Sequence, residues 1–312
     1  MDLKQLKALV TVAETGSVTK ASQLLHLVQP AVTRQIKTLE QELGVPLFER
    51  TRQGMRPTEA GAALVERARR ALNELDRARA ELRPEPGPVT GIATVGLLES
   101  TLDVLVPPLV ERLRERHPGI TVRLMTAYSG HLQQWLDDGD VDLSLLYNLR
   151  STPSLHMRPL LREQLWAVAL PEAGLRSDQP VSLADLSAHP MVMPAVGHGL
   201  RVLIDQVYAR AKTSPDIVIE TNSLLVQKKL VLAGYGWTVL PAAGVAADVA
   251  AGLLSASPLA DPEAARDVVL GLPRTGRPAL AVEVVARELV GLVGMLVESG
   301  AWPSARLFGD ST

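Results

Sequence analysis

Residues 30–43 constrain the fold more than any other segment, because this predicted helix has two marked ends and two different sides. Pro30 suits a first helical turn, where its missing N–H costs nothing, and Gly44 is a typical helix stop. Apolar residues recur at steps of four and three and form a narrow stripe: Val32, Ile36, Leu39 and Leu43. The opposite side carries polar and cationic residues together with the proline: Pro30, Thr33, Arg34, Lys37 and Gln41.

Two more helical patterns precede this one, over residues 3–14 and 18–27, and only a few residues join the second helix to the third. Ser17 is a good N-cap for the second helix. Two amphipathic helices with so short a connection predict a helix-turn-helix. After Gly44 the stretches LFERT, RQGM and RPT indicate two short strands and a turn. We therefore expect a winged helix-turn-helix domain over residues 1–58.

The charges of this domain favour a nucleic-acid partner, although the whole chain has a net charge of -2 and any basic footprint must be local. Between residues 17 and 57 the bases Lys20, Arg34, Lys37, Arg50, Arg52 and Arg56 outnumber the acids Glu40, Glu42 and Glu49. For the third helix alone, a solvated face is the ordinary explanation. Together with an arginine-bearing hairpin, however, such a helix fits the major groove of DNA. The predicted DNA contacts are Gln29, Pro30, Thr33, Arg34 and Lys37 in the helix, and Arg50, Arg52 and Gln53 in the wing.

The stretch KASQLLHLVQPAVTRQIKTLEQELGVPLFERTRQGMRPTEAG resembles the amino-terminal signature of the LysR-type transcriptional regulators, notably in QPAVTRQI, LEQELG, LFER and TEAG. The sequence departs from the family at two positions. Val28 stands where the family usually has serine, and Thr33 stands where serine is also frequent. Val28 lacks a hydroxyl that could cap the helix or contact phosphate.

A long helix is expected from residue 58 to 83, followed by a hinge at PEPGPVTG. Its apolar residues repeat in steps of four and three, as in a heptad seam: Leu64, Ala68, Ala71, Leu75, Ala78 and Leu82. The seam could pack on its own domain, but the charges around it favour pairing with a second copy. The resemblance implies a dimerising linker, which we place at residues 59–90, and a homotetramer. The residues themselves leave a homodimer or a homotetramer open.

Strand and helix patterns alternate beyond residue 91 and predict a doubly wound α/β fold with two similar lobes. Strands near LLREQLWAVAL and DVVLGLP would cross between the lobes. We assign residues 91–162 and 268–312 to the first lobe and residues 163–267 to the second. The fold class is thus a multi-domain α/β protein, with a winged helix-turn-helix, a linker helix and a bilobed effector domain. The resemblance implies that this domain is similar to the periplasmic binding proteins.

Small polar residues follow four of the predicted strands, where helix N-termini can present free N–H groups to a ligand. Each turn alone could simply cap its helix, and Arg201 could pair with Asp205 one turn on. Because turns from both lobes converge, we expect a small effector, an organic anion, between them. The predicted effector contacts are Ser100, Thr101, Ser129, His198, Gly199, Arg201 and Asn222, and the resemblance implies the same region.

The sequence gives little support to other functional classes. It has no G-x-S-x-G, Walker or G-x-G-x-x-G motif, no cysteine and no histidine pair at metal spacing, so we expect neither an enzyme nor a cofactor or metal. A solute-binding transport component would have no use for the first 83 residues. Nothing at the amino terminus resembles a signal peptide, and no segment favours a membrane span, so we expect a cytoplasmic protein. Paired copies would bind the two halves of an imperfect palindrome in promoter DNA.

Overall fold

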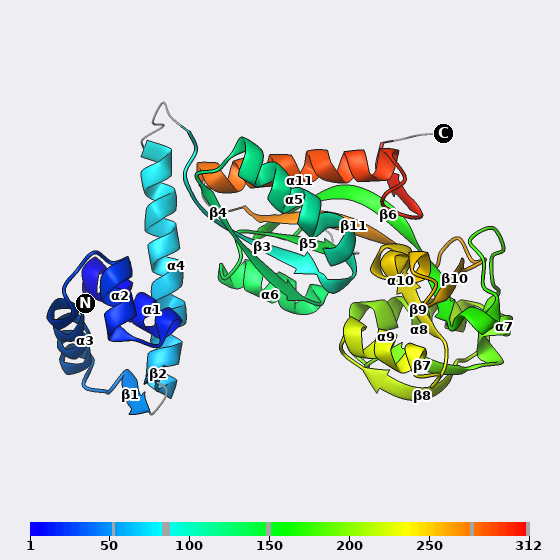
Figure 1. Ribbon diagram of the computed structural model, residues 1–312, viewed down its shortest axis with the longest axis horizontal. Helices are drawn as coiled ribbons and strands as arrows, with labels where there is room; N and C mark the ends of the chain where they lie inside the picture. The colour runs from blue at the N-terminus through cyan, green and yellow to red at the C-terminus, as the bar shows by residue number, and fades with distance from the viewer. Residues whose placement is uncertain (52–53, 83–87, 148–150, 275–277, 310–312) are drawn as a thin grey trace. The chain divides into compact units, whose positions relative to one another are not determined.

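The computed structural model describes residues 1–51, 54–82, 88–147, 151–274 and 278–309 (Figure 1). The chain divides into an amino-terminal unit, which ends at residue 86, and a carboxyl-terminal unit. The first contains the expected winged helix-turn-helix and the second the expected α/β effector domain, so the fold class is confirmed. Across the described residues, no helix combines the length and the apolar character that a membrane crossing requires.

The amino-terminal unit packs three short helices and a two-stranded wing against a long helix. Its elements are α1 (Leu3–Thr15), α2 (Val18–Leu24), α3 (Gln29–Leu43), β1 (Phe48–Thr51), β2 (Gly54–Pro57) and α4 (Glu59–Leu82). The predicted stripe of α3 supplies Val32, Ile36 and Leu39 to the core, where they meet Leu9 of α1. Leu43 is exposed instead, because the helix ends at Gly44 before its last turn reaches the core.

The helices of this unit begin and end close to the residues predicted from the sequence. The Ser17 hydroxyl accepts from the Lys20 amide at 3.4 Å and caps α2, as predicted. Helix α2 ends at Leu24 rather than at residue 27, because His26 adopts a left-handed conformation with a φ of 53°. Val28 precedes α3 without any side-chain cap, which agrees with its missing hydroxyl.

Local contacts fix the wing beside the helix-turn-helix. Glu40 of α3 accepts the amide of Leu47 at 2.8 Å, just before β1 begins. The Met55 amide of β2 donates to the carbonyl of Gly16 at 2.8 Å, in the turn between α1 and α2. A side chain at Gly54, whose φ is 123°, would collide with that carbonyl. The wing therefore depends on a close backbone approach that only glycine allows.

The first lobe of the carboxyl-terminal unit is a sheet covered by helices on both faces. Its strands β3 (Gly91–Leu98), β4 (Ile120–Ala127) and β5 (Leu143–Tyr147) are parallel. Helices α5 (Leu102–Arg116) and α11 (Leu280–Glu298) cover one face, and α6 (Ser129–Asp138) covers the other (Figure 1). Because β3, β4 and β5 are parallel, their carboxyl ends all lie at one edge of the sheet.

The second lobe is built around a parallel pair, β7 (Pro190–Pro194) and β8 (Asp216–Thr221). Helices α8 (Gly199–Arg210) and α9 (Leu224–Leu232) follow these two strands, as the sequence predicts. The remaining elements are α7 (Leu183–Ser187), β9 (Thr238–Pro241), α10 (Ala246–Ala250) and β10 (Ser255–Pro258). Strand β10 and the later β12 (Ala305–Leu307) were not predicted, because such short strands show no measurable alternation.

Two antiparallel strands connect the lobes. Strand β6 (Leu155–Ala169) pairs with β11 (Ala265–Pro273) over its first part and with β9 and β10 over its last residues. The main sheet has the order β10-β6-β11-β5-β3-β4. The crossing predicted near LLREQLWAVAL and DVVLGLP thus corresponds to β6 and β11, and a site between the lobes must lie against these two strands.

Candidate functional site

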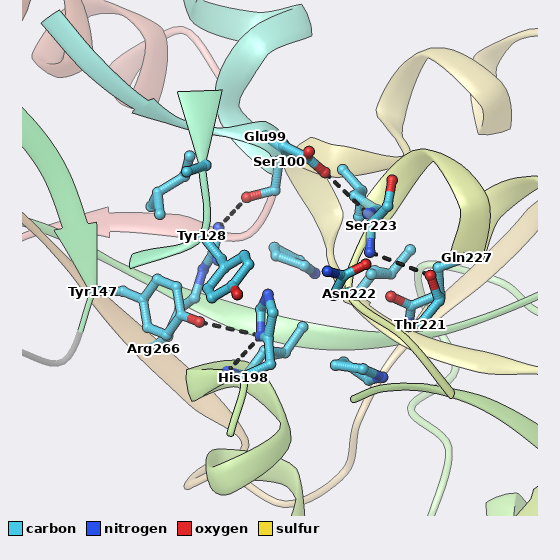
Figure 2. Close-up of a pocket in the computed structure, with 17 residues that line it drawn as sticks. Glu99, Ser100, Tyr128, Tyr147, His198, Thr221, Asn222, Ser223, Gln227 and Arg266 are labelled. Atoms are coloured by element: carbon cyan, nitrogen blue, oxygen red, sulfur yellow. Dashed lines mark hydrogen bonds between the residues drawn. The ribbon is translucent and has the colours of Figure 1, made fainter. Parts of the chain in front are cut away.

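A pocket lies where the carboxyl ends of strands from both lobes meet (Figure 2). The first lobe contributes Glu99 and Ser100 after β3, Tyr128 after β4 and Tyr147 at the end of β5. The second lobe contributes His198 before α8, and Thr221, Asn222 and Ser223 before α9. Arg266 of β11 forms the back wall of the pocket. The empty volume of the pocket is about 470 Å³, part of it open to solvent, which is in the size range of a small-molecule site.

The back of the pocket is a buried ion pair. The Arg266 guanidinium binds the carboxylate of Glu163 across the paired strands β6 and β11, and both side chains are almost fully buried. Trp302 donates its indole N–H to the other oxygen of Glu163 at 2.9 Å. Arg266 also donates to the Ser100 hydroxyl at 2.6 Å and lies 5.1 Å from the centre of the Tyr147 ring. These contacts fix one cation in the wall of the pocket.

Ser100 remains able to serve a ligand despite its bond to Arg266. Its oxygen accepts that bond, and among the described residues its own proton has no acceptor. A hydroxyl can donate once while it accepts. Ser100 therefore offers a donor at the foot of the pocket, next to the buried positive charge.

His198 forms the opposite wall. Its Nδ1 accepts from the Leu200 amide at 3.1 Å, which caps α8, and lies 3.4 Å from the Tyr147 hydroxyl. With Nδ1 as an acceptor, the neutral ring carries its proton on Nε2. Burial, helped by the charge of Arg266, lowers the pKa of His198 to about 4, and burial raises the pKa of Tyr147. Both rings are therefore uncharged at neutral pH.

Glu99 and Asn222 are two of the polar residues that line the α9 side of the pocket. Glu99 accepts the amide of Leu224, the first residue of α9, at 2.9 Å, so this carboxylate of the first lobe holds a helix end of the second. Asn222 is exposed, and its amide makes no hydrogen bond to another described residue. Figure 2 shows the Asn222 side chain on the side of the pocket across from His198.

Three of the predicted effector contacts line the pocket, namely Ser100, His198 and Asn222. Three others support its walls without lining it. Thr101 donates to the Leu98 carbonyl, Ser129 accepts the Tyr147 amide, and Gly199 has no room for a side chain because the Tyr147 ring lies against it.

The structure places Arg201 away from the pocket. Its guanidinium is bound by Asp205 at 2.8 Å, by Glu220 at 2.5 Å and by the carbonyl of Pro194. This placement corrects the prediction that Arg201 faces a ligand, because two carboxylates already use its donors. The structure shows the alternative instead, in which Arg201 pairs with Asp205 one helical turn away.

The pocket residues that the predicted set omitted include four with charged or aromatic side chains: Glu99, Tyr128, Tyr147 and Arg266. Glu99 lies in a predicted turn, and its charge was the signal that could have drawn attention to it. Tyr128 directly follows a predicted strand, and Tyr147 ends one. Ligands bind at the carboxyl ends of parallel strands, so this rule also covers both tyrosines. Arg266 gave no local signal, because its partner Glu163 is distant in the sequence.

The candidate nucleic-acid surface lies on the amino-terminal unit. Gln29, Pro30, Arg34 and Lys37 of α3 are exposed, Thr33 is half-buried, and Arg50 of β1 is exposed. Among the residues that the structure describes, Arg34, Lys37 and Arg50 have no ion-pair partner. Arg52 and Gln53, the other predicted contacts, lie outside the described residues. The predicted polar side of α3 is therefore available to a partner.

Part of the apolar seam predicted on helix α4 packs against the helix-turn-helix of the same unit. Ala68 is buried and Leu64 is half-buried against the helix-turn-helix core, which also takes Val65. Ala71 is exposed and Leu75 is 41% exposed. The side chains of Ala78 and Leu82 lie outside the described residues. Packing within the unit therefore accounts for Leu64 and Ala68, and pairing with a second copy stays a prediction for the rest of the seam.

Glu163→Gln should lower the free energy of unfolding of the carboxyl-terminal unit by about 3–5 kcal/mol, because it leaves the buried guanidinium of Arg266 without its counter-charge. The control is Asp267→Asn, whose partly exposed pair with Arg162 adjoins Glu163 and Arg266 on the same strands. It should cost about 1 kcal/mol or less. Urea unfolding followed by tryptophan fluorescence reports this unit, since all 4 tryptophans lie in it. Equal losses in the two variants would contradict the assignment.

The ring of His198 should titrate near pH 4 rather than near 6.5. Since the unfolded chain binds this proton more readily, the contribution of His198 to stability is complete above about pH 6.5 and declines as the pH falls toward 4. The measurement is the ring-proton NMR shift of His198 against pH, assigned with His198→Asn. A midpoint near 6.5 would show that the ring is not buried as described.

Both units match families of known proteins. Residues 3–62 match the bacterial regulatory helix-turn-helix protein family named for LysR, and residues 86–292 match the LysR substrate binding domain. Over 303 residues the chain is 30% identical to the HTH-type transcriptional regulator BbuR of Bordetella bronchiseptica, with 97% of this chain and 93% of that protein covered. The family resemblance of the sequence is thereby confirmed.

Solved structures agree in fold. The probable transcriptional regulator PA0477 from Pseudomonas aeruginosa has a TM-score of 0.73 at 22% identity, covering 93% of this chain and 97% of that one. Full-length CbnR complexed with its target DNA has a TM-score of 0.63 at 23% identity, covering 95% and 99%. The chain belongs to the LysR family of transcriptional regulators, with a DNA-binding helix-turn-helix unit and a substrate-binding domain.

Proposed function

We propose that the pocket between the lobes binds a small organic anion and that this ligand controls transcription. The observation that carries the proposal is the buried guanidinium of Arg266, which donates to Ser100 in the pocket wall. Three further donors face the same space: the Ser100 hydroxyl, the Nε2–H of His198 and the amide of Asn222. Converging donors beside a fixed cation stabilise a carboxylate through charge-assisted hydrogen bonds.

Regulation requires that the ligand bind one arrangement of the lobes more tightly than another. Strands β6 and β11 connect the lobes, and Arg266 lies on β11 opposite Glu163 on β6. A carboxylate that binds Ser100 and His198 contacts the first lobe and the second at once. It therefore favours one relative position of the lobes, which the assembly transmits to its DNA-binding units.

Binding of small carboxylates to the full-length protein should be detectable by isothermal titration calorimetry. Ser100→Ala should weaken binding about 3- to 30-fold, because a carboxylate then loses one donor. Arg201→Lys is the control, since Arg201 does not line the pocket, and it should leave the affinity unchanged. No binding of any carboxylate, or the same affinity in Ser100→Ala, would overturn the proposal.

We also propose that the amino end of α3 contacts base edges in the major groove, while the wing contacts phosphates. The candidates are those predicted from the sequence: Gln29, Pro30, Thr33, Arg34, Lys37, Arg50, Arg52 and Gln53. The exposed cationic groups of Arg34 and Lys37 lie on the side of α3 opposite its buried stripe, and among the described residues they have no ion-pair partner, which supports this assignment.

Arg34→Ala should weaken binding to the protein's own promoter about 5- to 100-fold, the value of a good bidentate base contact, and reduce the preference over random DNA. Lys7→Ala removes an exposed charge from α1 and should change binding little. Gel retardation on specific and random duplexes at several salt concentrations measures both. Equal weakening on the two duplexes would make Arg34 a phosphate contact and contradict the base contact.

We propose further that two copies pair through the part of α4 beyond its own core, at Ala71, Leu75, Ala78 and Leu82. Leu64 and Ala68, also predicted at the seam, contribute mainly to packing within the unit. The exposed Ala71 and Leu75 support this interface, because exposed apolar residues on a regular seam are typical of helix pairing. The number of copies beyond two stays a prediction.

Ala71→Glu should shift the protein toward monomer at micromolar concentration, because it places charges in the proposed seam. Ala62→Glu makes the same change on the opposite side of α4, about 180° away at 100° per residue, and should not. Ala62 is also exposed, so the two variants differ in position alone. Sedimentation velocity measures the assembly. An unchanged assembly in Ala71→Glu would rule out this seam.

A further inference from the structure

Glu99 places a negative charge in the pocket at the amino end of α9, where a second anionic group of a ligand would otherwise bind. Its Oε2 accepts the amide of Leu224 at the start of α9, and Ser223 caps the same helix through the amide of Val226. The positive end of the α9 dipole is therefore already matched by a carboxylate of the protein. Oε1 of Glu99 has no hydrogen-bond partner among the described residues, and Glu99 lines the pocket.

The charges around the pocket are unevenly distributed between its two sides. Arg266 is the only cation among the described lining residues, and Glu163 partly offsets it from behind. The Ser100 and His198 side offers two hydrogen-bond donors, the Ser100 hydroxyl and the Nε2–H of His198. The Glu99 side offers an acceptor that carries a full negative charge. A ligand with carboxylates at both ends would bring one of them against Glu99, and like charges at short distance repel.

We infer that the effector is a compact carboxylate that also carries an amino group, with its carboxylate at Ser100 and its ammonium at Glu99. This inference rests on the proposed anion site and names the class of ligand within it. The free Oε1 of Glu99 accepts from the ammonium. The rings of Tyr128 and His198, whose centres are 5.1 Å apart, form a wall for the carbon skeleton. Glu99 is thus the specificity-determining residue of the pocket.

The test uses sets of three ligands that share a side chain and differ in one group on the carbon next to the carboxylate. That group is an ammonium, a methyl or a second carboxylate, as in alanine, isobutyrate and methylmalonate. Isothermal titration with the full-length protein should rank the amino acid first and the dicarboxylate last. The amino acid should bind about 10- to 100-fold more tightly than its methyl counterpart, as expected for a charge-assisted hydrogen bond.

Glu99→Gln should reduce this preference at least tenfold and improve binding of the dicarboxylate. Asp103→Asn removes an exposed carboxylate in the first turn of α5 and should leave the ranking unchanged. If carboxylates bind but Glu99→Gln keeps the wild-type ranking, the inference fails while the proposed anion site stands. If no carboxylate binds, both fail. Should Glu99→Gln not fold, the wild-type ranking decides alone, and a methyl or dicarboxylate ligand in first place overturns the inference.

Discussion

The carboxyl-terminal unit depends on one buried ion pair between the two strands that connect its lobes. Glu163 of β6 and Arg266 of β11 face each other in the strand register, and the pair is closed to water. Buried charges are costly unless hydrogen bonds satisfy them, and here Trp302, Ser100 and the ring of Tyr147 complete the environment. Because both members lie on the crossing strands, the same contact that holds these strands together also positions a cation at the back of the pocket.

The rest of the pocket is arranged around that cation. Ser100 joins Arg266 to the turn after β3, and the neutral His198 caps α8 while it faces the same space. Glu99 reaches from the first lobe to the first amide of α9 in the second. A ligand in the pocket would therefore interact with groups that already connect the lobes. This offers a physical basis for ligand control, since a small change in these bonds alters which lobe arrangement is favoured.

Local patterns in the sequence predicted the elements well and the site only in part. The helices of the amino-terminal unit followed from apolar periodicity and glycine stops. Ser100, His198 and Asn222 were found because polar turns after parallel strands meet at one edge. Arg266 and Glu163 could not be found in this way, since 103 residues separate them and strand residues show no sign of their partner. Arg201, in contrast, was predicted in the pocket but lies outside it, because its donors bind Asp205 and the more distant Glu220.

We propose that a carboxylate binds between the lobes and contacts both of them. Hydrogen-deuterium exchange of the full-length protein, with and without a bound carboxylate, measures this contact. We expect slower exchange in three separate segments, at residues 98–102, 198–202 and 222–226, which belong to both lobes. Slower exchange confined to one lobe, or to the surface around Arg162 and Phe308 where a second cavity lies, would contradict it.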